Sequence, residues 1–287
     1  MLKKAIRTAQ NYFPQLREAK NLAYHWARRR FRLLHDADFA LISRLPVRAD
    51  DLFLDVGGNR GQSILSIQAI RPDVRIVSFE PNATMFAWLT RHFASDRRVG
   101  LIPVGLGAAP SHRVLYTPAY RGFTYDGLAT FSREGARKYL SPETIYGFRR
   151  HHVSVAEQVC EMRTLDSYGL KPTFIKIDVE GCEHEVLQGA LRTLATHRPV
   201  LMIERYYDNP AVAPLLKWLG YVEVRLEGDG FVRGTTTSEN MICMTPEMLR
   251  ALSPATPAPM PSRQLRETTD PMPAPGRDGA PFSRPTP

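Results

Sequence analysis

Cysteine is scarce in this sequence, and its few copies form no informative pattern. Only three of the 287 residues are cysteines, Cys160, Cys182 and Cys243, and no two of them make a C-x-x-C pair. Their number is odd and their spacing fits no metal-ligand pattern with the histidines, which excludes a disulfide framework and a zinc site of the common kinds. We therefore expect a reducing compartment.

Long apolar runs are missing as well. No stretch of about 18 consecutive apolar residues occurs, so the sequence predicts no transmembrane helix. The basic N-terminus also has no apolar core of the length found in signal peptides. Together with the unpaired cysteines, these two features predict a cytoplasmic protein.

Net charge is absent from most of the chain. The total is +9, and residues 1–35 alone hold nine Lys or Arg against one acid. Residues 36–253 hold 25 basic and 25 acidic side chains, and residues 254–287 hold four and three. A domain that binds nucleic acid normally carries a basic face of its own. We therefore expect no nucleic-acid partner.

Residues 1–35 predict a basic amphipathic helical segment. Apolar side chains recur at spacings of three and four, at Leu16, Ala19, Ala23, Trp26, Ala27, Phe31 and Leu34. Much of the other face carries cations, at Arg17, Lys20, Arg28, Arg29 and Arg32. One interpretation is a helix that packs on the domain and exposes its basic face to water. The other is a peripheral contact with the anionic inner face of a membrane, or with an acidic partner.

The end of the chain predicts no folded structure. From Ser253 onward it holds ten of the 23 prolines and little apolar content. Such a composition cannot offset the entropy of ordering a chain. The sequence thus divides into the basic segment 1–35, one α/β domain over 36–252 and a disordered tail over 253–287.

A glycine-rich turn organises the domain. Residues 55–61 read Asp-Val-Gly-Gly-Asn-Arg-Gly, after the apolar run 52–54 and before 63–70, whose apolar positions fit one face of a helix. This is a strand, a turn and a helix in succession. Glycines without Cβ let the turn tighten and let a ligand lie against the backbone. Asp55 stands at the carboxyl end of the strand, where open α/β sheets bind their ligands.

A second acidic strand end strengthens this interpretation. Residues 75–79 predict the next strand, and Glu80, Pro81 and Asn82 follow it. In nucleotide-binding α/β folds, an acid at the end of the second strand, about 20 residues beyond the glycine turn, holds the ribose diol. The sequence therefore predicts a nucleoside site between the two turns.

The chemistry of the turn favours S-adenosylmethionine as the nucleoside. From Gly57 the chain reads G-G-N-R-G, which departs from the dinucleotide pattern G-x-G-x-x-G. Asp55 would repel a pyrophosphate but tolerates a sulfonium and an amino group. The predicted donor contacts are Asp55, Gly57, Gly58, Asn59, Gly61, Glu80, Pro81, Asn82 and Gly105. A nicotinamide-dependent oxidoreductase and a non-catalytic scaffold of the same fold remain as alternatives.

The rest of the domain continues the alternation of strands and helices. Further strands are expected over 99–104, 173–177, 200–203, 221–226 and 241–244, with helices over 84–93, 183–194 and 210–219. The short connection between the last two strands favours an antiparallel hairpin. This order predicts an α/β fold with helices on both faces of the sheet.

Residues 110–160 interrupt that alternation. They are rich in aromatic and cationic side chains, and we expect an insertion that forms a lid over the acceptor. The alternative is a surface excursion without a chemical role. The predicted acceptor contacts are Arg121 and His151 from the insertion and Glu204 after the fifth strand.

Several motifs together resemble the FkbM-type methyltransferase family. They are Asp-Val-Gly-Gly-Asn-Arg-Gly at 55–61, Phe-Glu-Pro at 79–81, Val-Gly-Leu-Gly at 104–107, Thr-Leu-Asp at 164–166, Phe-Ile-Lys-Ile-Asp-Val-Glu-Gly at 174–181, Val-Leu-Gln-Gly-Ala at 186–190 and Ile-Glu at 203–204. The resemblance covers residues 52–245. It implies the seven-stranded Rossmann-like sheet of S-adenosylmethionine-dependent methyltransferases. It also implies, for this family, O-methylation of acceptors such as sugars or secondary metabolites.

Methyl transfer to an alcohol also benefits from a general base. Asp178 and Glu180 are the best placed candidates, because they end a central strand beside the donor site; Glu204, His151 and His152 are further candidates. Asp178 and Glu180 could instead orient the donor or cap the next helix. Asp178 and a neighbour could also bind Mg²⁺, but no dedicated oxygen-rich loop occurs, so no metal is predicted.

Overall fold

The computed structural model describes the chain except for residues 1, 14, 206–209, 229, 236–237 and 253–287. The predicted disordered tail therefore lies outside the described residues. No helix in the described part is long and apolar enough to cross a bilayer.

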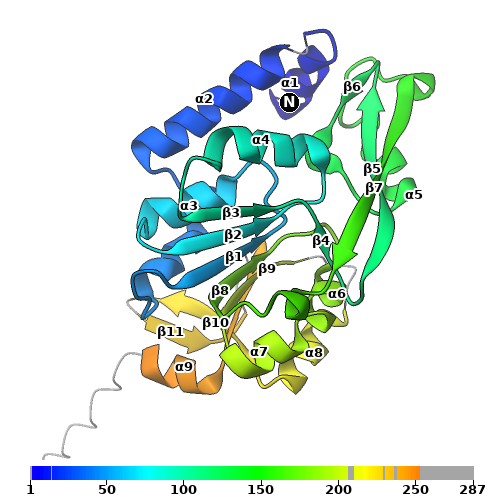
Figure 1. Cartoon of the computed structure of the whole chain (residues 1–287). Coiled ribbons are helices and arrows are strands. Elements are labelled where there is room, and N and C mark those ends of the chain that lie inside the picture. Colours follow the sequence, from blue (N-terminus) through cyan, green and yellow to red (C-terminus); the bar gives the residue numbers. More distant parts are fainter. Residues whose placement is uncertain (1, 14, 206–209, 229, 236–237, 253–287) are drawn as a thin grey trace, which may run out of the picture. The chain divides into compact units, whose positions relative to one another are not determined.

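A mixed sheet of eight strands forms the centre of the domain (Figure 1). Its strands follow the order β11-β10-β12-β9-β8-β1-β2-β3. Their bounds are β1 (Leu52–Val56), β2 (Arg75–Phe79), β3 (Val99–Ile102), β8 (Pro172–Ile177), β9 (Val200–Glu204), β10 (Val222–Glu227), β11 (Gly230–Arg233) and β12 (Asn240–Met244). The strands from β9 to β3 pair in parallel, whereas β12 is antiparallel to both β9 and β10. The carboxyl ends of five parallel strands therefore share one edge.

The sheet has one strand more than the seven that the family resemblance implied. The predicted strands 221–226 and 241–244 are antiparallel neighbours, as expected. The hairpin itself, however, joins β10 to the unpredicted β11 through the register Glu227 to Gly230. The chain then returns to place β12 between β9 and β10.

Helices cover both faces of the sheet. Alternate residues of one strand face opposite cores: Phe53 packs with α3 (Gln62–Ile70), α4 (Ala83–Phe93) and η1 (Ala37–Arg44), and Leu54 packs on the other side. The second core contains α6 (Glu183–Gln188), α7 (Leu191–His197) and α8 (Val212–Trp218), while α9 (Pro246–Leu252) packs beside the first. Burial of both faces explains the nearly continuous apolar runs of the parallel strands.

The helix predicted over 183–194 is two helices. The break falls at Gly189 and Ala190, between α6 and α7. A Cβ on Gly189 would lie 2.0 Å from the carbonyl oxygen of Gly107, so two backbones meet there. Glycine at position 189 therefore allows a close backbone approach that a side chain would prevent.

The insertion folds into a small sheet of its own. Its order is β4 (Gly105–Leu106), β7 (Val153–Arg163), β5 (Ser111–Tyr120) and β6 (Phe123–Thr124). Short helices complete it: η2 (Asp126–Leu128), α5 (Arg133–Lys138) and η3 (Arg150–His152), with η4 (Leu165–Tyr168) after it. Strands β5 and β7 pair over ten consecutive positions, which makes a long ribbon beside the main sheet (Figure 1).

Two helices, α1 (Leu2–Gln10) and α2 (Gln15–Phe31), pack over the domain near α4 and β6 (Figure 1). The orientation of α2 differs from the expectation. Trp26 and Phe31, expected to face the domain, are 61% and 58% exposed. Three of the cations that were expected to face water are instead partly buried: Arg17, Lys20 and Arg28. The reason is a buried acid, Asp126, which accepts an ion pair from Arg17 at 2.9 Å.

Candidate active site

The glycine turn between β1 and α3 is fixed by contacts with neighbouring strands. Gly57 has a φ of +93°, and a Cβ there would lie 1.8 Å from the carbonyl oxygen of Asp178. A Cβ on Gly58 would meet the Ser78 hydroxyl at 2.2 Å, and one on Gly61 would meet the Phe93 ring at 2.3 Å. The glycines are thus required first by the packing of the turn.

Asp55 also helps to hold the glycine turn in place. Its side chain is fully buried, and its Oδ2 accepts a hydrogen bond from the Ser78 hydroxyl at 2.9 Å. Burial raises the pKa of Asp55 to about 6. Asp55, Gly58 and Gly61 are absent from the pocket lining among the described residues. Their packing supports the turn, and their contact with the donor stays a prediction.

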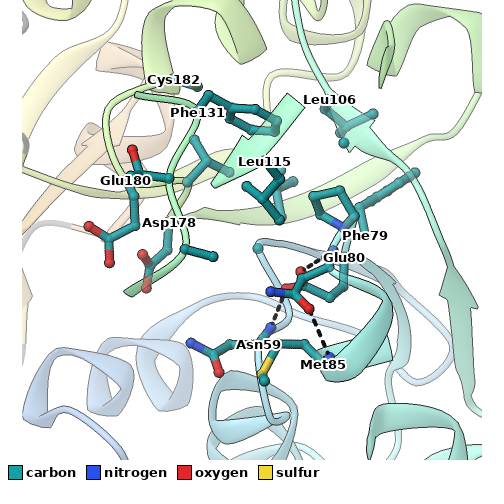
Figure 2. A pocket seen from close by; sticks show the side chains of 18 of the residues that line it. Asn59, Phe79, Glu80, Met85, Leu106, Leu115, Phe131, Asp178, Glu180 and Cys182 are labelled. Carbon is teal, nitrogen blue, oxygen red and sulfur yellow. Dashed lines mark hydrogen bonds between the residues drawn. The ribbon is translucent and has the colours of Figure 1, made fainter. Parts of the chain in front are cut away.

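A pocket opens at the carboxyl ends of the parallel strands (Figure 2). Six of the predicted donor contacts line it: Gly57, Asn59, Glu80, Pro81, Asn82 and Gly105. The insertion adds Leu115, Ala129, Thr130 and Phe131, so part of the predicted lid does form a wall of the pocket. Figure 2 shows Asp178 and Glu180 on one side and Glu80 on the other, with Asn59 between them.

Glu80 joins the two turns of the pocket. Its Oε2 accepts the Asn59 N–H at 2.7 Å and its Oε1 accepts the Asn82 N–H at 2.8 Å (Figure 2). Burial raises the pKa of Glu80 to about 7. Each carboxylate oxygen has two acceptor positions, so both oxygens retain one for a ligand hydroxyl.

The two asparagines have different tasks. The Asn82 side chain caps α4, because its Oδ1 accepts the N–H groups of Thr84 and Met85. The Oδ1 of Asn59 is buried and has no hydrogen-bond partner in the described part of the chain. A buried acceptor without a partner is costly, and this one belongs to a residue that lines the pocket.

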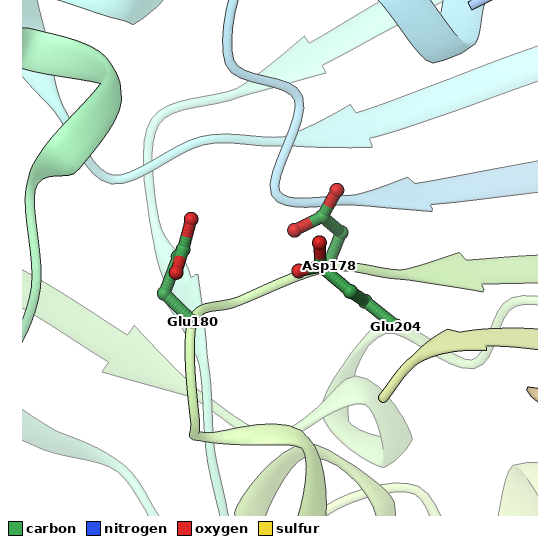
Figure 3. Close-up of side chains that lie close together, drawn as sticks. All are labelled: Asp178, Glu180 and Glu204. Atoms are coloured by element: carbon green, nitrogen blue, oxygen red, sulfur yellow. The ribbon is translucent and has the colours of Figure 1, made fainter. Parts of the chain in front are cut away.

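Three carboxylates gather at the ends of β8 and β9. Asp178, Glu180 and Glu204 each offer an oxygen within 4.8 Å of the others (Figure 3). The ammonium of Lys176 lies 3.4 Å from Asp178 Oδ2 and offsets part of this negative charge. Glu180 has a φ of +54°, an unfavourable backbone conformation for a side chain of this size, of the kind found at functional sites.

The carboxylates shift each other's protonation. Partial desolvation in the pocket, followed by the charges of Asp178 and Glu183, raises the pKa of Glu180 to about 7. Burial, a hydrogen bond to Asp178 and the Asp178 charge raise the pKa of Glu204 further above its ordinary value. The raised pKa favours the neutral form of Glu204, which lessens the repulsion among the three carboxylates.

The structure separates two predicted acceptor contacts from the pocket. Arg121 lies in the turn between β5 and β6, where its guanidinium stacks over Tyr12 at 5.4 Å. His151 lies in η3 and is exposed. The long β5–β7 ribbon carries both to its far end. Glu204, the third predicted contact, is beside Asp178 and Glu180.

Several pocket residues were not predicted. They are Met85, Leu115, Asp126, Phe131, Met162 and Cys182. The sequence held only a short signal, the alternation Cys160-Glu161-Met162, which the burial pattern of β7 extends to the exposed Val159. That period of two predicts a strand with one covered face.

The strand order, the glycine turn, the acid after β2 and the carboxylates after β8 define a Rossmann-like methyltransferase. Residues 55–229 match the model of the methyltransferase FkbM domain. The chain therefore belongs to this family, and the resemblance seen in its motifs is confirmed.

Known proteins similar to this chain include much longer ones. The AMB antimetabolite synthetase AmbE of Pseudomonas aeruginosa is 27% identical over 218 residues, covering 65% of this chain and 10% of AmbE. The solved methyltransferase FkbM of Methylobacillus flagellatus is 18% identical with a TM-score of 0.44, covering 70% of this chain and 47% of its own. A SAM-dependent O-methyltransferase of Thermotoga maritima is 8% identical with a TM-score of 0.38, covering 74% and 66%. The chain thus spans about a tenth of AmbE and about half of the FkbM protein.

Proposed function

We propose that this methyltransferase uses S-adenosylmethionine to methylate a hydroxyl group of a sugar, a glycolipid or a secondary metabolite. One observation carries the proposal: a single pocket has a nucleoside-type acid, Glu80, at one side and the carboxylates Asp178 and Glu180 at the other. The first suits a ribose, and the second suits an acceptor hydroxyl that must lose a proton.

The residues present fit the donor. Glu80 keeps acceptor positions for ribose hydroxyls, and the buried Asn59 Oδ1 offers a partner to the donor's amino group. Leu106 and Met162 supply apolar walls suited to an adenine. S-adenosylmethionine supplies an activated methyl group, which leaves the protein to align the acceptor oxygen and remove its proton.

Glu180 is our candidate for the general base. Its pKa of about 7 matches proton transfer near neutral pH. Asp178, which lies beside Lys176 and Glu204, is placed to accept a hydrogen bond from the same hydroxyl and orient it. The acceptor oxygen then bonds to the methyl carbon as the carbon–sulfur bond breaks, and the proton ends on Glu180.

The same three carboxylates could instead hold a divalent cation, because their oxygens lie close enough together. Mg²⁺ there would acidify the acceptor hydroxyl directly. Treatment with a chelator separates the two mechanisms. A side-chain base predicts unchanged turnover after dialysis against EDTA, whereas a metal mechanism predicts a loss that added Mg²⁺ restores.

The decisive experiment has two steps. Calorimetry first compares S-adenosylhomocysteine with NADH and NADPH; we expect binding of the first alone, and binding of a nicotinamide alone would favour an oxidoreductase. Extracted sugars, glycolipids and small metabolites are then incubated with the protein and a deuterium-labelled methyl donor. Mass spectrometry should find a labelled methyl group on an oxygen. Label on carbon or nitrogen would contradict O-methylation, and donor binding without transfer to any acceptor would favour a scaffold.

We also propose that α2 contacts the anionic inner face of a membrane. The outer face of α2 and the two residues after it expose aromatic and aliphatic side chains beside cations, at Leu22, Trp26, Arg29, Arg30, Phe31, Arg32 and Leu33. Aromatic rings favour the membrane interface, and each nearby cation adds about 1 kcal/mol of attraction to anionic lipid at low salt.

Sedimentation with phosphatidylglycerol vesicles tests this contact. The full chain should pellet at low salt and be released as salt rises. The variant Arg29→Gln/Arg32→Gln should remain in solution, and so should Trp26→Ala/Phe31→Ala. The variant Arg48→Gln/Arg97→Gln, which removes two exposed charges outside α2, is the control and should pellet like the parent protein. Failure of the parent protein to pellet would leave α2 as a packed helix or a site for a protein partner.

A further inference from the structure

A cavity under α2 is lined by four cations and one acid. Arg7 comes from α1, Arg17 and Lys20 from α2, and Arg60 from the glycine turn; the acid is Asp126. We call this the cationic cavity. Uncharged Tyr24 and Asn21 complete the side formed by α2.

The acid is already engaged by two of the cations. Asp126 Oδ2 lies 2.9 Å from Arg17 Nη1 and 3.2 Å from Arg60 Nη2. Arg7 and Lys20 have no ion-pair partner within the described ranges of the chain. One carboxylate therefore faces four positive charges, and the surplus is not neutralised by the protein itself.

The surplus is costly where it lies. Lys20 is partly buried, and desolvation together with the charges of Arg60, Arg17 and Arg7 lowers its pKa. Burial also lowers the pKa of Arg60, although Asp126 opposes that shift. Like charges held together away from water destabilise a fold unless a counter-charge joins them. The arrangement is what a site for a bound anion requires.

The cationic cavity adjoins the donor pocket. Asp126 and Gly127 line both spaces, and Arg60 follows the pocket residue Asn59 directly in the chain. The Arg60 Nη1 lies 3.8 Å from the point where a Cβ of Gly127 would be. A molecule seated in the pocket can therefore extend past Gly127 towards the cations.

We propose that the cationic cavity binds a phosphate or carboxylate group carried by the acceptor. Arginine forks match the oxygens of such groups in pairs, and lysine adds a mobile point charge. The part of this statement that concerns the acceptor rests on the proposed methyl transfer. The binding of an anion does not, because it follows from the cavity alone.

Calorimetry on the full chain, with inorganic phosphate at constant ionic strength in chloride, tests anion binding. The parent protein should bind phosphate. Lys20→Met and Arg7→Met should each weaken this binding about tenfold, while the affinity for S-adenosylhomocysteine stays unchanged because neither residue lines the donor pocket. Arg30→Met, an exposed cation on the outer face of the same helix, is the matched control and should bind phosphate normally.

Thermal denaturation distinguishes anion binding from a purely structural role of Lys20, because the two predict melting-temperature changes of opposite direction. Without phosphate, Lys20→Met should melt above the parent protein, because one unpaired cation is gone. With phosphate the parent protein should gain several degrees and Lys20→Met should gain less. Phosphate binding no stronger than that of chloride, or equal binding by Lys20→Met, would overturn the proposal.

Two further ligands identify the source of the anion. Glycerol 3-phosphate that competes with inorganic phosphate indicates a soluble phosphorylated acceptor. Short-chain phosphatidylglycerol below its micelle concentration, if it displaces inorganic phosphate where glycerol 3-phosphate does not, indicates a lipid headgroup. If the protein binds the donor but not phosphate, only the proposal for the cationic cavity is wrong. If it binds phosphate but not the donor, the proposed methyl transfer is wrong and anion binding stands.

Discussion

The two sides of the pocket are built on opposite principles. The donor side consists of tight turns between parallel strands, where Gly57 and Glu80 are fixed by backbone groups of neighbouring strands. The proposed acceptor side combines the carboxylates after β8 and β9 with the insertion, and it adjoins the cationic cavity under α2, which contains ion pairs such as Arg17 with Asp126. One side tolerates almost no change of shape, and the other presents charge and exposed rings.

This difference determines how far the residues of each side can change. A donor of constant structure is served by a scaffold in which each glycine is required by packing. Acceptors differ among methyltransferases, and segments attached outside the main sheet can change without disturbing its core. Substitutions on the donor side should therefore reduce stability and donor affinity together, whereas those on the acceptor side should change binding or turnover alone.

The largest expected effect is at the acceptor end of the pocket. Glu180→Gln should lower kcat about 10²–10⁴-fold, the usual contribution of a general base. The pH profile of the parent protein should rise with an apparent pKa of about 7, and this limb should vanish in the variant. Folding and affinity for S-adenosylhomocysteine should persist. If the pH profile of the variant still rises, Glu180 is not the general base, and Asp178 becomes the next candidate.

Gly57→Val should destabilise the fold at the turn that forms the donor side of the pocket. The new Cβ would overlap the Asp178 carbonyl and occupy a φ of +93°, at a cost of about 3 kcal/mol in the free energy of unfolding. Gly122→Val is the matched control, because Gly122 has a φ of +79° but no atom within 4 Å of its Cβ position. Urea denaturation should show the larger loss for Gly57→Val. Equal losses would mean that backbone strain, and not the clash, dominates.

Asp55 should make stability depend on pH. Its pKa is about 6 in the folded protein against an ordinary value of 3.8, so the folded state binds more protons between these values. Stability should fall as the pH rises through that window, by about 2–3 kcal/mol. Asp55→Asn should flatten this fall when unfolding is measured from pH 4 to pH 7. A parent protein that gains stability over the window would refute the buried carboxyl.

Glu80→Ala should have the smallest effect, yet it should affect two properties at once. Donor affinity should drop by about 1–3 kcal/mol, the scale of hydrogen bonds to a charged group. The structure adds a loss of stability, because the N–H groups of Asn59 and Asn82 lose their acceptor. Calorimetry and thermal denaturation measure the two effects. A stable variant with normal donor affinity would exclude Glu80 from the donor site.

Much of the donor side could be predicted from the sequence. The turn 55–61, the acid Glu80 and the acidic end of β8 are local patterns, in which a strand, a turn and a helix follow within a few residues. Their residues meet because parallel strands bring their carboxyl ends to one edge. For Asp55, Gly58 and Gly61 the donor contact stays a prediction, since a motif does not show which of its residues face the ligand and which support the turn.

The acceptor side could not be predicted in this way. The periodicity of α2 placed Trp26 and Phe31 on one face and cations on the other, but not which face meets the domain. Arg121 and His151 were expected at the acceptor because of their chemistry, whereas the length of the β5–β7 ribbon places them at its far end.

The sequence by itself determined the alternation of parallel strands and helices, the two turns after β1 and β2, and the family, because these depend on neighbours along the chain. Only the tertiary structure decided that Arg17 and Lys20 of α2 face the domain, that Glu204 lies beside Asp178 and Glu180, and that four cations and one carboxylate line a cavity beside the pocket. Each of these depends on residues that are distant in sequence and near in space. The interaction energy of two charges depends on the distance between them and on their burial. Neither the distance nor the burial can be read from the order of the residues along the chain.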